Sequence, residues 1–225
     1  GMAWAQGPAT AFPERPVKIV VPFAPGAGTD AMGRLVAQKL GEVMGGTFVV
    51  DNKAGASGAI GTQYVAQQAP DGYTLVMGST TSLSVVPHLD SKVPYSAERD
   101  YARISLVGLL NTALTASANV PHKNAKELIA QLKAQPESIT SATQGVGSYS
   151  HLAGEWFAAG SGTKIKFVPY NTTSPYTDVV GGQINVIFDA LPAAIGNVKA
   201  GKLKILALTG KSRHPSFPDV PTFAE

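Results

Sequence analysis

Short apolar runs alternate along the chain with longer segments in which apolar residues recur every three or four positions. The β-branched run at 17–21 predicts a buried strand, and residues 31–44 show helical spacing of apolar side chains. Further strands are expected at 47–50 and 73–77, with a helix at 58–68 between them. This alternation of strand and helix predicts a parallel sheet with helices on both faces.

A second cycle of the same kind begins near residue 104. The apolar stretch 104–117 predicts a strand that leaves the first unit, and Asn124 with Glu127 has the form of a capping box that opens a helix ending before Pro136. The remaining expected elements are strands at 138–142, 165–168, 184–188 and 202–209 and helices at 149–159, 174–181 and 192–200. The pattern therefore predicts two α/β lobes joined by two crossings, near 110–114 and 207–212.

These crossings set the predicted domain boundaries. Lobe 1 is expected over 13–112 and lobe 2 over 113–212, with 213–225 returning to lobe 1. Lobe 1 is then incomplete at its C-terminal end and needs a further segment. Residues 1–12 are interpreted as a signal-peptide remnant and lead-in, because Ala3-Trp4-Ala5 has the A-x-A form that signal peptidase accepts.

Composition narrows the possible functions. Hydrophobic residues make up 44% of the 225 residues and charged residues 15%, which is typical of a folded protein rather than a disordered one. The net charge of +3 is spread without a basic cluster, which argues against a nucleic-acid partner. The absence of cysteine excludes disulfides and thiolate chemistry, and the 4 histidines lack metal-ligand spacing. No cofactor is expected.

The loop from 22 to 30 is the first candidate for ligand binding. It joins the first strand to the first helix, and Gly26 and Gly28 allow the backbone to approach a ligand closely. Backbone N–H groups at such a helix start attract anions, and the Thr29 hydroxyl can donate to a carboxylate or cap the helix. The alternative is an ordinary tight turn.

Polar loops after other strands repeat this chemistry. Gly145, Gly147 and Ser148 form a similar glycine loop in the second unit, while the hydroxyl run 79–82 follows the third strand. The polar loop 169–175 follows a further strand, and Asp189, at the end of another, either faces a ligand or caps the next helix. Neither glycine loop carries Arg or Lys, so an anion there would be held by N–H groups and hydroxyls.

Two enzymatic hypotheses compete with binding. The spacing Gly26-x-Gly28-x-x-Ala31, with Asp51 after the next strand, fits a dinucleotide fingerprint and hence an NAD-type oxidoreductase. Pro22–Pro25 make the turn longer than that fingerprint needs, and Asp30 would place a carboxylate beside the pyrophosphate. A hydrolase is disfavoured because no G-x-S-x-G elbow occurs, although Ser, His and Asp side chains are present.

Six blocks, in order from residue 12 to 225, resemble the Bug family of periplasmic binding proteins of tripartite tricarboxylate transporters. They are FPERPVKIVVPFAPGAGTD, VVDNKAGASGAIG, APDGYTLVMGSTTS, GVGSYSHLAGEWF, KFVPYNTTSPYTDVVGGQINVIFD and SRHPSFPDVPTFAE. The resemblance implies a two-lobed Venus-flytrap fold and a small carboxylate ligand: a di- or tricarboxylate or an aromatic acid. It also implies a periplasmic monomer that is not an enzyme and that delivers its solute to membrane permease subunits.

The resemblance also implies a set of ligand contacts. In the first lobe they are Phe23, Ala24, Gly28, Thr29, Asp30, Ser79, Thr80 and Thr81, and in the second they are Gln144, Ser148, Tyr170, Thr173 and Asp189. One departure concerns specificity. Family members commonly have G-N-G-S where this chain has Gly145-Val146-Gly147-Ser148, and Val146 cannot supply an amide side chain.

Overall fold

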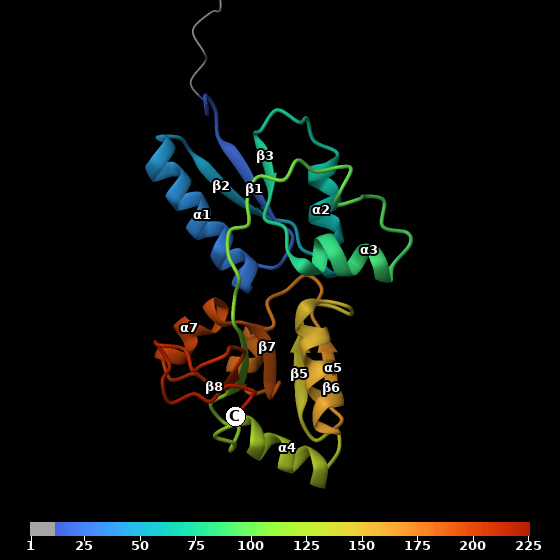
Figure 1. Cartoon of the computed structure of the whole chain (residues 1–225), viewed down its shortest axis with the longest axis vertical. Helices are drawn as coiled ribbons and strands as arrows, with labels where there is room; N and C mark the ends of the chain where they lie inside the picture. Colours follow the sequence, from blue (N-terminus) through green and yellow to red (C-terminus); the bar gives the residue numbers. More distant parts are fainter. Residues whose placement is uncertain (1–11) are drawn as a thin grey trace, which may run out of the picture.

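The chain folds into two lobes, lying one above the other in Figure 1. The structure is a computed structural model that describes residues 12–225. The prediction of a signal-peptide remnant therefore lies outside the described residues, apart from Phe12. Within the described part of the chain, no helix is both long enough and apolar enough to cross a membrane.

Lobe 1 is built on an all-parallel sheet in the order β2-β1-β3. Four of the five residues of the central strand β1 are apolar and buried, which suits a strand with a neighbouring strand on each side. The helices α1 and α2 flank the sheet (Figure 1). The elements of the lobe are β1 (Val17–Val21), α1 (Gly28–Met44), β2 (Phe48–Asn52), η1 (Ala56–Gly58), α2 (Ala59–Ala66), β3 (Thr74–Val76), η2 (Thr81–Val85) and α3 (Val86–Leu89).

Lobe 2 contains a mixed sheet in the order β6-β5-β7-β4-β8, in which β4 runs antiparallel to both neighbours. Along β7, Val186 and Phe188 pack towards α4 and α5, whereas Ile187 packs towards α6 and α7. Both faces of the sheet are thus covered by helices. The elements are β4 (Thr112–Ser117), α4 (Ala125–Ala134), β5 (Thr140–Thr143), α5 (Tyr149–Ser161), β6 (Lys166–Pro169), α6 (Tyr176–Val180), β7 (Val186–Ala190), α7 (Leu191–Lys199) and β8 (Leu203–Leu208).

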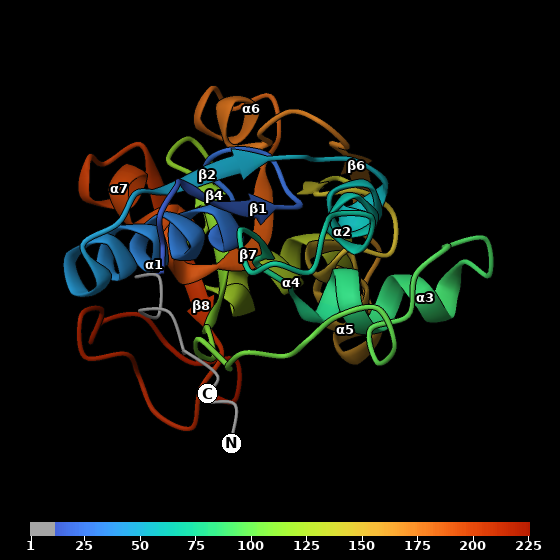
Figure 2. The same cartoon turned by 90° about the horizontal axis from the view of Figure 1, so that it is seen from above.

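The end of the chain differs from the prediction that 213–225 returns to lobe 1. Phe217 and Val220 pack against the cluster formed by β4, α7 and β8, and Leu208 forms a β-bridge with Thr222. The apolar surface beside β8 therefore holds this segment on lobe 2. Among the described residues the chain passes between the lobes once, before β4, rather than twice (Figures 1 and 2).

The strand predicted over 104–117 is also shorter than expected. Only Thr112–Ser117 forms β4, and residues 104–111 have no strand partner among the described residues. The side chains of Ile104, Leu106 and Leu109 are 78%, 76% and 89% exposed. An apolar pattern indicates a preference for burial, but a strand also needs a neighbour with free backbone groups.

The predicted capping box at the start of α4 is confirmed. The Asn124 side chain accepts a hydrogen bond from the Glu127 amide at 3.0 Å, while the Glu127 carboxylate accepts from the amide of Lys123. We expect Asn124→Ala to lower the free energy of unfolding by about 1 kcal/mol, because one helix N–H loses its partner. Urea unfolding checks this, and Asn124→Ser, which can still cap, should retain most of the stability.

Candidate functional site

The site lies where the loops of the two lobes meet. In lobe 1 the loops after β1, β2 and β3 leave from the same end of the parallel sheet, and in lobe 2 the loops after β5 and β6 do the same. Open α/β sheets bind ligands outside the carboxyl ends of their strands. The topology therefore directs five loops towards the boundary between the lobes.

A small cavity lies at this boundary. Lobe 1 contributes Phe23, Ala24, Ala27, Gly55 and Gly58, and lobe 2 contributes Gln144, Tyr170, Asn171, Thr173 and Pro175. Its volume is about 10 Å³, roughly the space that one water molecule needs. The structure thus shows the two lobes closed against each other.

Hydrogen bonds fasten this closed arrangement. The Ser57 hydroxyl donates to the Val146 carbonyl across the boundary at 2.7 Å, and the Tyr149 amide at the start of α5 donates to the Thr81 hydroxyl at 2.8 Å. Each bond joins a loop at the end of a lobe 1 strand to the glycine loop 145–148 or the helix after it. Separation of the lobes would break both bonds.

Glycines allow this close approach. A Cβ at Gly145 would lie 2.7 Å from the Ser57 hydroxyl oxygen, and one at Gly28 would lie 2.4 Å from the Cβ of Ala190. Both distances are shorter than van der Waals contact. The predicted role of these glycines was backbone approach to a ligand, and the structure shows backbone approach to the opposite lobe.

Asp189 is buried at the same boundary, with 5% of its surface exposed. Its carboxylate accepts hydrogen bonds from the Ala190 amide at 2.7 Å, from the Gln144 side chain at 3.0 Å and from the Tyr176 hydroxyl at 3.2 Å. Burial raises its pKa to about 6, although the bonds from Ala190 and Tyr176 and the Gly28 amide of lobe 1 oppose the rise. The closed structure therefore makes Asp189 easier to protonate than an ordinary aspartate.

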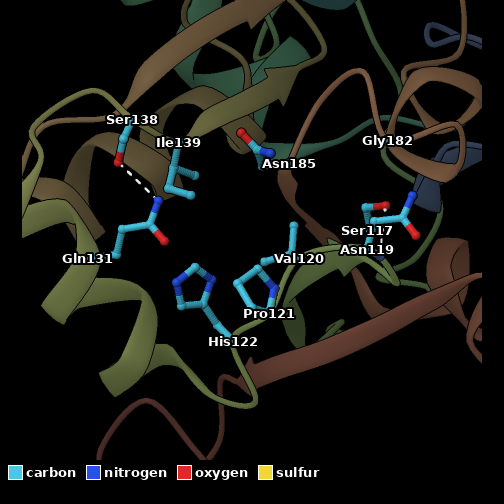
Figure 3. Close-up of a pocket in the computed structure, with 10 residues that line it drawn as sticks. All are labelled: Ser117, Asn119, Val120, Pro121, His122, Gln131, Ser138, Ile139, Gly182 and Asn185. Carbon is cyan, nitrogen blue, oxygen red and sulfur yellow. Dashed lines mark hydrogen bonds between the residues drawn. The ribbon is translucent and has the colours of Figure 1, made fainter.

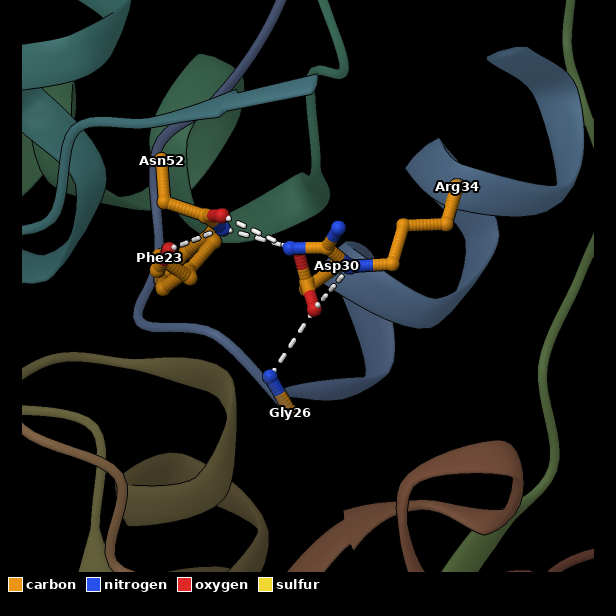
Figure 4. A network of polar contacts seen from close by, with 5 residues as sticks. All are labelled: Phe23, Gly26, Asp30, Arg34 and Asn52. Atoms are coloured by element: carbon orange, nitrogen blue, oxygen red, sulfur yellow. Dashed lines mark hydrogen bonds and ion pairs between the residues drawn. The ribbon is translucent and has the colours of Figure 1, made fainter. Parts of the chain in front are cut away.

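Asp30 does not line the cavity but binds the backbone of the first glycine loop, in the network of contacts that Figure 4 shows. Its carboxylate accepts from the Gly26 amide at 2.9 Å, from Arg34 at 3.0 Å and from the Asn52 side chain at 2.8 Å. Asn52 also donates to the Phe23 carbonyl, so β2 and α1 together fix the loop. Burial alone would raise the pKa of Asp30, but these hydrogen bonds outweigh it and lower the pKa.

The remaining predicted residues occupy three kinds of position. Phe23, Ala24, Gln144, Tyr170 and Thr173 line the cavity. Gly28, Thr81, Ser148 and Asp189 lie at or beside contacts between the lobes, and Ser148 caps α5 by accepting from the His151 amide. Ser79 bonds Ser82, Thr80 is exposed, and Thr29 is half-buried without capping α1. Ligand contact by the predicted set stays a prediction.

The predicted contacts omit several residues that line the cavity. Gly55 and Gly58 lie in the loop after β2 and have φ angles of 135° and 94°. Glycines directly after a predicted strand could have indicated this loop. Ala27, Asn171 and Pro175 lie within loops already singled out, where sequence alone gives no reason to prefer one position over its neighbour.

The lining of the cavity is uncharged and combines apolar with polar side chains. The Tyr170 hydroxyl donates to Asp178, and burial together with that carboxylate raises the pKa of Tyr170 to about 12. The phenol therefore stays neutral at physiological pH. Gln144, Asn171 and Thr173 add amide and hydroxyl groups, and the lining contains neither Lys nor Arg.

A larger hollow of about 140 Å³ lies at the other end of lobe 2 (Figure 3). It is formed by the turn after β4, by α4 and by the amino ends of β5 and β7, and His122 and Asn185 line it. Only lobe 2 residues form its walls. It therefore lies away from the boundary at which the strand carboxyl ends converge.

Residues invoked for the enzymatic alternatives have structural partners. Asp51, which the dinucleotide fingerprint would assign to a ribose, lies 3.6 Å from the ammonium of Lys18 and 3.4 Å from that of Lys53. His151 accepts from the Gly147 amide, and its ring packs edge-on against Phe167 with centroids 5.1 Å apart. These contacts account for both residues without nucleotide or hydrolytic chemistry.

Comparison with known proteins agrees with the resemblance seen in the sequence. Residues 32–225 match the tripartite tricarboxylate transporter family receptor, TctC. Protein BugT of Bordetella pertussis is 36% identical over 219 residues, which cover 96% of this chain and 67% of that protein. A protein encoded in the tcbD-tcbE intergenic region of Pseudomonas sp. strain P51 is 35% identical, and the match covers 64% of its length. The chain thus spans about two thirds of these curated relatives.

Solved structures show the same fold. A periplasmic transporter is 37% identical with a TM-score of 0.90, over 95% of this chain and 72% of that one. The periplasmic binding protein BugD is 35% identical with a TM-score of 0.83, over 94% and 71%. Rpa4515 of R. palustris, solved with adipate, is 32% identical with a TM-score of 0.86, over 95% and 72%. With its two α/β lobes and the match over most of its length, this chain belongs to the TctC receptor family of tripartite tricarboxylate transporters.

Proposed function

We propose that this protein captures a small carboxylate in the periplasm and presents it to the membrane permease subunits of a tripartite transporter, releasing the solute chemically unchanged. The observation that carries this proposal is the convergence of five strand-end loops, from both lobes, on one boundary whose cavity is uncharged and carries hydrogen-bonding side chains. A ligand there would contact both lobes at once. Its binding energy would therefore favour closure.

The chemistry of the boundary suits a weakly held carboxylate. Amides and hydroxyls from Gln144, Asn171 and Thr173 can donate to carboxylate oxygens. Because the lining contains no Lys or Arg, the binding site lacks the charge-assisted hydrogen bonds that hold phosphates tightly. A transported solute has to be released again, and a neutral site favours release.

Two relatives support carboxylates as the ligand class. Rpa4515 was solved with adipate, and MatC of Rhodopseudomonas palustris, which is 28% identical with a TM-score of 0.80, was solved with malate. Both ligands are dicarboxylates. A cavity of about 10 Å³ cannot hold either one, so binding to this chain requires the lobes to part first and close afterwards.

Thermal unfolding in the presence of candidate solutes tests the proposal. The set comprises adipate, malate, citrate, benzoate, glutamate and NAD. A ligand that binds the folded state raises the unfolding midpoint, by several degrees at about 100 times its Kd. We expect one carboxylate class to raise the midpoint and NAD to leave it unchanged. A rise with NAD alone would favour the oxidoreductase, and isothermal titration of every carboxylate without heat would contradict the proposal.

A further inference from the structure

We infer that Asp189 couples closure of the lobes to proton uptake, so that protonation of Asp189 favours the closed form and its ionisation favours the open form. The inference rests on the proposed function, because it describes how that same site is regulated. It follows from the position of this one carboxyl group between the lobes, inside the closed structure and beside the cavity.

Both lobes bury Asp189. Its own lobe supplies Gln144, Tyr176 and the Ala190 amide as hydrogen-bond donors. Across the boundary, the first residue of α1, Gly28, places its backbone against the same carboxylate, and a Cβ there would lie 3.6 Å from an Asp189 oxygen. Opening of the lobes removes this contact and admits water to that side of the carboxylate. The closed and open forms therefore solvate the group differently.

Among the residues that the structure describes, no cationic side chain contacts this carboxylate. Within residues 12–225, the titratable group that faces it is the phenol of Tyr176 on α6, which stays neutral because burial raises its pKa well above the usual value. From α1, Asp30 is turned away into its bonds with Arg34 and Asn52. From β4 the cross-strand partner is Ala113, and from β5 the nearest contact is the amide of Gln144.

The protonated form fits its surroundings. A proton on the oxygen that faces Tyr176 and Gln144 can be donated to the phenol oxygen, or to the amide oxygen after rotation of the Gln144 amide. The other oxygen can still accept from the Ala190 amide. A neutral Asp189 thus keeps its hydrogen bonds without the cost of a buried charge.

The size of the effect follows from linkage. The pKa in the closed form is about 6, against 3.8 for an unperturbed Asp. If the open form has a nearly ordinary pKa, the ratio of closed to open molecules rises about tenfold between pH 7 and pH 5. The sign is fixed: closure is favoured as pH falls through 6, and the effect levels off below the open-form pKa.

Small-angle X-ray scattering of the ligand-free chain between pH 4.5 and 8 tests the coupling. The wild type should become more compact as pH falls through 6, whereas Asp189→Asn should show no such step. Asp219→Asn removes a carboxylate at an exposed turn and serves as the matched control that should retain the step. The carboxyl ¹³C resonance of Asp189 in the wild type should titrate above the ordinary value of 3.8 and over the same pH range as the compaction.

A compaction step that persists in Asp189→Asn would overturn the inference, as would an Asp189 resonance that titrates outside the pH range of the compaction. Neither readout needs a ligand, so both stand even if no carboxylate binds. If adipate binds, calorimetry in two buffers of different ionisation enthalpy should show close to one proton taken up per adipate at pH 5, and none in Asp189→Asn. Adipate binding without proton uptake would refute the coupling but leave the proposed function intact.

Discussion

Replacing Gly28 with alanine is expected to weaken carboxylate binding by roughly 5- to 150-fold while lobe 1 stays folded. The new Cβ would lie 2.4 Å from the Cβ of Ala190 in the closed structure, so the lobes could not meet without a shift. Overpacking of this kind costs about 1–3 kcal/mol. Because Gly28 is the first residue of α1 and does not have a positive φ, alanine is tolerated by the backbone there.

Two measurements distinguish hindered closure of the lobes from a general loss of folding in Gly28→Ala. Calorimetry gives the affinity for the carboxylate that most stabilises the wild type, and X-ray scattering gives the compactness of the ligand-free chain, which should decrease. The matched control is Gly160→Ala in α5, where a Cβ would meet nothing within 4 Å. Wild-type affinity in Gly28→Ala would mean that the closed contact between the lobes is not part of the bound state.

The sequence predicted most of the secondary structure because burial and periodicity are local properties. The strands β1 and β7 were predicted because each contains a short run of mostly apolar residues, and the Asn124 capping box marked the start of α4. The conformation of residues 104–111 and the packing of residues 213–225 depended instead on which surfaces of the folded lobes remained uncovered. No pattern within a segment carries that information.

For the candidate site, too, the sequence predicted local features but not the contacts between distant segments. The loops were identified because they follow predicted strands and contain glycines and hydroxyls. The roles of individual residues could not be predicted, because a carboxylate such as that of Asp30 can face a cleft or the interior of its lobe with the same sequence around it. Its partner Asn52 lies 22 positions away, and only the β1–β2 register brings the two together.

Asp30 and Asp189 are both buried aspartates, yet their environments shift pKa in opposite directions. Asp30 receives bonds from a guanidinium, an amide side chain and a backbone N–H, and its pKa is lowered. Asp189 has no cationic partner in the described part of the chain, and burial raises its pKa. One therefore stabilises the fold as an anion, and the other opposes closure as an anion.

Asp30→Asn should lower the free energy of unfolding by about 2 kcal/mol at pH 7.5, since an amide can replace only one of the two acceptor oxygens and bonds to charged groups contribute about 1.5–3 kcal/mol each. A lowered folded-state pKa means that the wild-type contribution is complete above the unfolded pKa of 3.8 and is lost as pH falls through the folded value. The difference between wild type and variant should therefore shrink towards pH 3. Urea unfolding at pH 7.5, 5 and 3 measures this difference in the free energy of unfolding, with Asp219→Asn as the exposed control.

A difference that stayed constant down to pH 3 would show that Asp30 acts through shape rather than charge. The position of the first glycine loop would then depend on packing of Phe23 and Ala27 in the lobe 1 core.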